Sequence, residues 1–280
     1  MTDRFNSPIE LVIEKRKSVR TYLEEPLTKE DMEGILAYMR DLSNPFGKQV
    51  KFSFLETEGN RKALGTYGII KGTVNYIGAA VKDEPLEVEA VGYEMEKLIL
   101  YCADKDIGTC WLGGTFKRED FKKAMDIEEG YLFPAITPVG YPKENKSIAD
   151  NLVRFIAKGD MRKPWSELFF MNTFNEPVDG KNANKYERIL EMVRLAPSAS
   201  NKQPWRILLK EGVWHFYEAK TPGYSDAFSY DIQKIDLGIA ACHFEMASTE
   251  KGIPGRISYL DPPDVECPDH FHYAFSWVEF

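Results

Sequence analysis

The sequence APSASNKQPW occupies residues 196–205, directly after a segment with the spacing of an amphipathic helix. Small residues and prolines make a stiff loop, through which backbone groups can approach a flat ligand closely. Ser198, Asn201 and Gln203 add hydrogen-bond donors and acceptors. A plain helix-to-strand connection with turn residues has the same composition, so this Pro-Ser loop by itself leaves both interpretations open.

Three further motifs lie before it. The arginine motif, RKSVR at 16–20, follows a first predicted helix. Its two arginines and serine can bind one phosphate together, although a solvated basic helix end is the simpler interpretation of the residue types alone.

The Trp-Gly-Gly loop, GTCWLGGTF at 108–116, has paired glycines that let a backbone N–H approach a ligand. It matches neither GxGxxG nor a Walker loop, and Cys110 has no base near it in sequence, which favours a packed thiol. Arg162-Lys163-Pro164 alone is a surface segment.

Helical and strand patterns are mixed along the chain, which predicts an α+β class. Thr28 and Asp31 indicate the start of one helix, and the prolines of 133–142 favour an edge strand or a strand end. The other expected helices are 9–15, 91–106, 118–125, 184–194 and 232–249, and the strands are 51–56, 74–81, 133–142, 205–210, 213–219 and 273–280.

The order of these elements repeats. Residues 35–49 align without a gap on 189–203, at an offset of 154. Gly92 aligns on Gly238 and residues 104–107 on 250–253, both at an offset of 146. Near-equal offsets suggest a duplicated unit, but two amphipathic helices also match a few residues by chance.

Composition limits the class of protein. The 280 residues are 43% hydrophobic, 13% aromatic and 29% charged, which is typical of a globular chain with one large or two small domains. The net charge of −8 argues against a nucleic-acid or anionic-membrane surface. No secretory signal or stretch of roughly 20 apolar residues is present. Four scattered cysteines and two neighbouring histidines, His270 and His272, form no metal pattern, so we expect a cytoplasmic protein without a metal site.

In this order, the four motifs resemble the FMN-dependent nitroreductase family, and in particular its tandem, double-length members known mainly from bacteria. The family signature begins Arg-x-Ser-x-Arg-x-aromatic, here Arg16, Ser18, Arg20 and Tyr22, and a basic residue before proline ends it. The resemblance implies a nitroreductase-like fold in which two pseudo-symmetric α+β halves, 1–165 and 166–280, pack as an internal dimer. The chain would then be a monomer, or at most a weak dimer.

The resemblance also implies a function. Hydride would pass from NAD(P)H to FMN and then to a small electron-poor acceptor such as a nitroaromatic, a quinone or an enone. FMN carries this chemistry, so no catalytic side chain is named. A flavin-binding or regulatory module without turnover, and a structural protein with an empty cleft, are the alternatives.

The implied cofactor residues have different roles. Arg16, Ser18, Arg20 and Arg162 would hold the phosphate or the polar edge of the ring, and the Gly113 and Gly114 N–H groups would face flavin N5. Lys71 would lie near N1 and C2=O, and the Pro-Ser loop would line the flavin from the other half. The full implied set is Arg16, Lys17, Ser18, Arg20, Lys71, Trp111, Leu112, Gly113, Gly114, Arg162, Pro197, Ser198 and Asn201.

The motifs are divided between the halves. The arginine motif and the Trp-Gly-Gly loop lie in the first half, and the intact Pro-Ser loop lies in the second. The first half's version of that loop, SNPFGKQ at 43–49, is degraded, and the segment around 169–172, taken as the counterpart of the arginine motif, has no arginine. We therefore expect one FMN site per chain, built from both halves.

Overall fold

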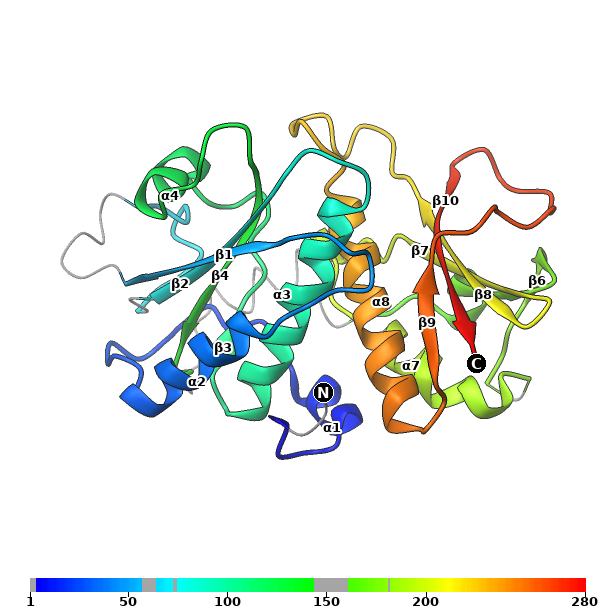
Figure 1. Ribbon diagram of the computed structural model, residues 1–280, viewed down its shortest axis with the longest axis horizontal. Coiled ribbons are helices and arrows are strands. Elements are labelled where there is room, and N and C mark those ends of the chain that lie inside the picture. Colours follow the sequence, from blue (N-terminus) through cyan, green and yellow to red (C-terminus); the bar gives the residue numbers. More distant parts are fainter. Residues whose placement is uncertain (1–3, 57–63, 73–74, 144–160, 181) are drawn as a thin grey trace.

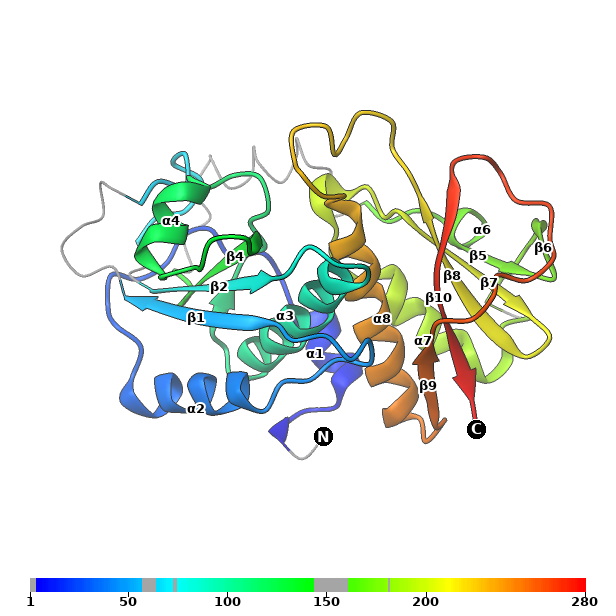
Figure 2. The same ribbon diagram turned by 45° about the horizontal axis from the view of Figure 1, so that its top comes forward.

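The computed structural model describes residues 4–56, 64–72, 75–143, 161–180 and 182–280. Two helices run side by side through the middle of the molecule, α3 (Glu87–Asp104) and α8 (Gln233–Glu250), and one β-sheet lies on each side of this pair (Figures 1 and 2). Both helices are buried on nearly all sides, which is typical of helices in the core of a domain. The predicted α+β class is confirmed.

The first sheet has the antiparallel order β1-β2-β4-β3. Its strands are β1 (Lys51–Glu56), β2 (Asn75–Val81), β3 (Gly108–Thr109) and β4 (Leu132–Gly140). Successive residues of β2 point to opposite faces, and every one of them is buried. Ile77 packs with Ile35 of α2 (Lys29–Arg40), and Tyr76 packs on Phe121 of α4 (Arg118–Ala124). The sheet is therefore covered on both faces.

The second sheet repeats this order as β7-β8-β10-β9. Its strands are β7 (Trp205–Lys210), β8 (Val213–Ala219), β9 (Gly255–Ser258) and β10 (Phe271–Glu279). The β7 edge carries two additional strands, β5 (Phe169–Met171), which pairs parallel with β7, and β6 (Thr173–Pro177). Strands β5 and β6 follow α6 (Trp165–Leu168) in the sequence. The chain then forms a short 3₁₀ turn, Asn184–Tyr186, and helix α7 (Glu187–Arg194) before it enters β7.

The elements thus occur twice in the same sequence, as α2-β1-β2-α3-β3-β4 and as α7-β7-β8-α8-β9-β10. This confirms the predicted pseudo-symmetric arrangement. The helices α4, α6 and α1 (Ile9–Lys15) stand outside the repeat. In Figure 1, α1 lies at the lower end of the central helix pair, and it contacts α3, α7 and α8.

The two central helices cross at a pair of glycines. A Cβ on Gly92 would lie 2.0 Å from the Ile235 carbonyl oxygen and 3.1 Å from the Gly238 Cα, and a Cβ on Gly238 would lie 1.9 Å from the Glu89 carbonyl oxygen. The backbones are therefore in direct contact, and a side chain at either position has no space. The two glycines that the repeat aligns are the ones that meet at the contact between the halves.

Two expectations about single elements are wrong. Strand β4 is not an edge strand, because it lies between β2 and β3, and of its expected prolines only Pro142 lies just past the strand end. Backbone N–H groups two residues apart in a strand point to the same side, and the N–H of Ile136 points to the β3 side. Pro134 and Pro138 therefore lack an N–H on that side, where β3 is only two residues long and needs few donors. Helix α3 starts at Glu87 rather than Val91, since its charged first turn is buried against the rest of the molecule. Residue 74 of the expected strand 74–81 lies outside the described residues.

The expected counterpart of the arginine motif is also wrong. Ser18 forms a bridge with Thr109 of β3, at one edge of the first sheet. Phe169–Met171 is β5 and pairs with β7, which corresponds in strand order to β1 at the opposite edge. The two segments therefore occupy non-equivalent positions. Phe169 is fully buried, which explains why this apolar segment joins the sheet instead of forming a loop.

Candidate functional site

The predicted motifs meet in one cleft of about 460 Å³ between the two halves. The first half contributes residues that include three arginines, and the second half contributes the Pro-Ser loop and the start of α8. The lining consists of Arg16, Ser18, Arg20, Trp111, Gly113, Gly114, Thr115, Arg162, Pro197, Ser198, Ala199, Ser200, Asn201, Tyr224, Phe228, Ile232, Ile235, Asp236 and Ile239.

The arginine motif is fixed at the rim of the first sheet. Helix α1 ends at Lys15, and the Val19 N–H then donates to the Thr109 carbonyl at 2.8 Å. The Tyr22 side chain is buried, and its hydroxyl donates to the Val19 carbonyl at 2.6 Å. These contacts determine where the motif runs, and with Arg162 they place three guanidinium groups in one cleft, which favours an anionic ligand.

The Trp-Gly-Gly loop forms a closely packed wall of the cleft. A Cβ on Gly113 would lie 2.9 Å from Ile232 Cδ1, and one on Gly114 would lie 3.3 Å from Phe228 Cζ. A side chain at either position would therefore occupy the cleft. Arg118 supports the loop from behind, because its Nη2 donates to the Gly113 carbonyl at 2.5 Å and its Nε to the Phe133 carbonyl at 3.0 Å.

The Pro-Ser loop has an unusual backbone. Ser200, Asn201 and Gln203 all have φ near +50°, a left-handed conformation that is uncommon for residues other than glycine and that surrounding contacts must hold in place. Ser200 and Asn201 belong to a short 3₁₀ turn, Ala199–Asn201. Arg162 Nη1 donates to Asn201 Oδ1 at 3.2 Å, and the Lys163 N–H donates to Gln203 Oε1 at 2.8 Å. The Arg162 segment therefore supports the loop as well as lining the cleft.

Asp236 of α8 lies at the base of the cleft and holds the same loop. Its Oδ1 accepts a hydrogen bond from the Ala199 N–H at 3.0 Å, and the side chain is buried. Among the described residues, its Oδ2 has no hydrogen-bond partner. Burial raises the pKa of Asp236 well above its ordinary value. The hydrogen bond from the Ala199 N–H lowers this pKa, and the nearby carboxyl groups of Glu218 and Asp231 raise it further. A raised pKa favours the protonated carboxyl, which offsets less of the positive charge of the arginines than a carboxylate would.

The segment between β8 and α8, the gold loop at the top of Figure 1, contributes Tyr224 and Phe228 to the cleft lining. Tyr224 Oη donates to Ser200 Oγ at 2.9 Å, and Arg118 Nη2 donates to Tyr230 Oη at 3.0 Å. The Arg118 guanidinium carbon lies 5.4 Å from the centre of the Phe228 ring. Sequence reasoning identified neither this segment, nor Arg118, nor Asp236 as part of the site, because no local pattern distinguishes them.

Three residues of the implied set lie outside the cleft lining. Leu112 is buried in the first sheet's core, where it bridges Ile136. The Lys17 and Lys71 side chains are exposed. The backbone of Lys71 nevertheless supports the motif, since its N–H donates to the Arg20 carbonyl at 2.9 Å and its carbonyl accepts from the Tyr22 N–H at 2.8 Å.

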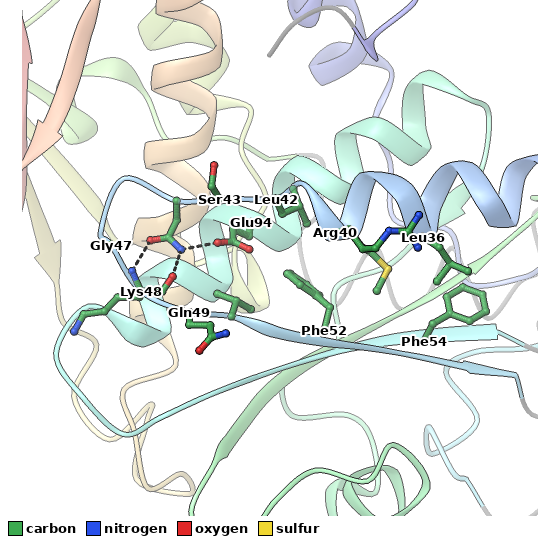
Figure 3. A pocket seen from close by; sticks show the side chains of 13 residues that line it. Leu36, Arg40, Leu42, Ser43, Gly47, Lys48, Gln49, Phe52, Phe54 and Glu94 are labelled. Carbon is green, nitrogen blue, oxygen red and sulfur yellow. Dashed lines mark hydrogen bonds between the residues drawn. The ribbon is translucent and has the colours of Figure 1, made fainter.

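The degraded loop at 43–49, which Figure 3 shows, is held by contacts that its counterpart lacks. Asn44 Oδ1 accepts from the N–H groups of Phe46 and Lys48, and Asn44 Nδ2 donates to Glu94 Oε1 at 2.5 Å. A cavity of about 720 Å³ adjoins this loop and opens between α2 and β1. Burial raises the pKa of Glu94 to about 7, even though the hydrogen bond from Asn44 and the charge of Lys97 both lower it. The loop is closed by its own asparagine, which stands where the intact loop has Ser198.

A second cleft, of about 650 Å³, corresponds to the first by pseudo-symmetry. Leu86, Glu89 and Tyr259 line it, and the offset of 146 places them opposite Ile232, Ile235 and Gly113. The cations of this cleft come from outside the segment around 169–172, since Lys48, Lys220 and Lys234 line it. Each of the three lies within 4.0 Å of a carboxylate, of Glu84, Asp231 and Glu89 respectively. Lysines neutralised in this way offer little net charge to a phosphate.

No helix in the described ranges is both long and apolar enough to cross a membrane. Within the same ranges, no group of three or more histidine, cysteine, aspartate or glutamate residues is placed to hold a metal ion.

One solved structure agrees with the fold over nearly the whole chain, and others match about half of it. A protein from Thermotoga maritima, described as a "putative nitroreductase", superimposes with a TM-score of 0.61 at 20% identity, over 98% of this chain and 93% of that one. A nitroreductase family protein from Clostridium novyi matches with a TM-score of 0.41 at 20% identity, over 50% of this chain and 90% of its own. A nitroreductase with bound FMN from Bacteroides fragilis matches with a TM-score of 0.42 at 14% identity, over 51% and 92%.

The sequence itself identifies the family. None of the curated proteins matches the chain significantly. The family model described as "Putative TM nitroreductase" matches residues 9–248, which is most of the sequence and includes all four motifs. The chain therefore belongs to this nitroreductase family, and its class is that of an oxidoreductase.

Proposed function

We propose that the chain is an FMN-dependent oxidoreductase that passes hydride from NAD(P)H through FMN to a small electron-poor acceptor, such as a nitroaromatic, a quinone or an enone. One observation carries the proposal. Three guanidinium groups and the glycine pair of one half face the Pro-Ser loop of the other half across a single cleft. Such a cleft offers separate surroundings for a phosphate and for a flat ring.

The residues present fit the cofactor. Arg16, Arg20 and Arg162, with the Ser18 hydroxyl, would bind the FMN phosphate or the polar edge of the ring through charge-assisted hydrogen bonds. The absence of side chains at Gly113 and Gly114 leaves room for the ring edge, since a Cβ there would reach Ile232 or Phe228. Pro197, Ser198 and Asn201 would line the opposite side, and Trp111 would contribute from the Trp-Gly-Gly loop. Lys17, Lys71 and Leu112 would support this set from outside the cleft.

When bound, FMN supplies two-electron chemistry, accepting hydride from one substrate and giving it to another. The chain's own residues bind, orient and exclude water. Ile232, Ile235 and Ile239 give the cleft an apolar wall, and Phe228 covers its glycine side. Low water content strengthens the electrostatic contacts of the arginines.

We expect apo-protein titrated with FMN to saturate at one equivalent per chain. Arg16→Ala removes charge-assisted hydrogen bonds worth about 1.5–3 kcal/mol each, or about ten- to a hundredfold in affinity. Asn201→Ala, in the other half, should weaken the same site. Lys15→Ala is the matched control, because its exposed side chain directly precedes the arginine motif and lies outside both the cleft lining and the proposed set. Flavin fluorescence quenching measures all four proteins.

Several outcomes would contradict the proposal. Two equivalents bound, or FMN affinity unchanged in Arg16→Ala, would remove the proposed site. The absorbance spectrum then separates an enzyme from a flavin-binding module. Both would be yellow, but only an enzyme is bleached by NAD(P)H and recolours when an acceptor is added.

The proposal includes the organisation of the chain. We propose that residues 1–165 and 166–280 are the two halves of a fused dimer and that the chain is a monomer, because the contact around Gly92 and Gly238 already joins the halves internally. Sedimentation equilibrium should therefore give the mass of one chain, 32.1 kDa. A tight dimer at micromolar concentration would contradict this expectation.

A further inference from the structure

A buried carboxylate lies directly behind the cleft. Glu96 of α3 is fully buried, and it contacts two cleft residues. Trp111 Nε1 donates to its Oε2 at 2.6 Å, and Arg16 Nε lies 3.8 Å from its Oε1. Glu96 itself does not line the cleft. One side chain therefore contacts both the arginine motif and the Trp-Gly-Gly loop.

A histidine from the other half fixes this carboxylate. His243 of α8 is fully buried, and its Nε2 lies 3.0 Å from Glu96 Oε1. Its Nδ1 lies 2.8 Å from the Met192 carbonyl oxygen. A carbonyl only accepts, so Nδ1 carries a hydrogen and the ring orientation is determined. A single hydrogen bond therefore joins His243 Nε2 and Glu96 Oε1.

The pair exists on one side of the pseudo-symmetric molecule. The offset of 146 places Cys242 opposite Glu96 and Lys97 opposite His243. The Cys242 thiol contacts Met246 Sδ at 3.6 Å, and the Lys97 ammonium lies 4.9 Å from the centre of the Tyr93 ring. Those residue types cannot reproduce the carboxylate–imidazole contact. The pair accompanies the cleft that has the arginines.

We propose that Glu96 and His243 are positioning residues for the flavin site. They hold Arg16 and Trp111 in their binding orientations, so that α8 of the second half determines the geometry of the first half's arginine motif. This inference rests on the proposed function, because it concerns the same cleft.

The physical reason is preorganisation. A side chain that is already held in its binding orientation loses less conformational freedom when the ligand arrives. Without His243, the buried Glu96 carboxylate loses a hydrogen-bond partner and is expected to rotate. This rotation loosens Arg16 and Trp111 at the same time, although His243 itself lies outside the cleft lining.

The experiment compares two buried histidines of the same half. His243→Phe removes the contact with Glu96, and His215→Phe is the matched control. His215 of β8 is also buried and bound, with Nδ1 2.8 Å from Ser276 Oγ, but it is not connected to the cleft. We expect about tenfold weaker FMN binding for His243→Phe, and unchanged binding for His215→Phe even if its melting temperature falls. Equal effects of the two variants would overturn the inference.

A double-mutant cycle tests whether His243 acts through Arg16. If it does, His243→Phe should weaken FMN binding less than threefold in an Arg16→Ala background, because the residue that it positions is already absent. Additive effects would overturn the inference. Glu96→Gln provides the rescue, since an amide can accept from Trp111 and donate to His243. It should bind FMN more tightly than Glu96→Ala.

A readout without flavin separates this inference from the proposed function. Acrylamide quenching of Trp111 in the apo-protein, isolated by subtracting a Trp111→Phe variant, should increase in His243→Phe and stay unchanged in His215→Phe. Failure of the wild-type protein to bind FMN would remove the proposed function, whatever the quenching shows. Normal FMN binding with unchanged quenching of Trp111 in His243→Phe would overturn the positioning role alone.

Discussion

Gly238→Ala is expected to lower the free energy of unfolding by about 3 kcal/mol, near the upper end of the usual effect of overpacking a core. The new Cβ would lie 1.9 Å from the Glu89 carbonyl oxygen and 2.9 Å from the Tyr93 nitrogen. Both are backbone atoms of α3, so no side-chain rotation relieves the contact. The two central helices must move apart, and urea denaturation measures the loss.

Gly34→Ala is the matched control, since Gly34 also lies inside a helix, α2. Its Cβ would lie 2.9 Å from Tyr101 Oη, the far end of a side chain that can move. Alanine gains up to about 1 kcal/mol over glycine in a helix interior. We therefore expect this variant to be as stable as the wild type or more stable. A similar loss in both variants would contradict the helix crossing as the constraint at Gly238.

The protein should become less stable as the pH rises from about 5 to 8. Burial raises the pKa of Glu218 to about 8, assisted by Asp231 and opposed by Lys220 and Lys234. Below its ordinary pKa of 4.5, this group is protonated in both the folded and the unfolded state. At higher pH the unfolded chain releases the proton and the folded chain retains it, so folding loses up to on the order of 4 kcal/mol by pH 8.

Glu218→Gln tests the origin of this dependence, because the amide has a similar shape and does not titrate. Urea unfolding at pH 5, 6, 7 and 8 should show a smaller slope in the variant than in the wild type. Glu94 contributes in the same direction, with a pKa of about 7, so some slope should remain. Carboxyl groups whose pKa is lowered in the folded protein, such as Glu191, change its stability only at pH values below about 5. Wild-type stability that is flat over the range, or an unchanged slope in the variant, would contradict the argument.

Local patterns predicted most of the elements but not how they pair. Strands 51–56, 205–210 and 213–219 have their observed bounds, and Thr28 Oγ1 accepts from the Asp31 N–H as an N-cap does. Strands β3, β5, β6 and β9 were not predicted, since two to five residues carry too little alternation to be read. Their positions are determined by neighbours far away in the sequence. The place of Pro134 and Pro138 inside a sheet follows from the shortness of β3, which the sequence does not show.

The candidate site was predicted where its residues form motifs and missed where they act singly. The glycine pair and the Pro-Ser loop have unusual local compositions, and they line the cleft. Asp236, Glu96 and His243 are single residues within buried helices that form no motif, and they acquire a role through partners 15 to 147 residues away. Leu112 shows the reverse error, because its place in a motif suggested a ligand contact but its side chain belongs to the core.

The contact between α3 and α8 has a consequence for synthesis on the ribosome. Helix α3 is buried on nearly all sides, but its main partner ends at Glu250, almost 150 residues after α3 ends at Asp104. At 5–20 residues per second, the nascent chain carries an uncovered apolar helix for roughly 7 to 30 s. A chaperone that binds exposed apolar segments should therefore associate with ribosome-bound chains that end before about residue 250, and should leave once α8 has emerged.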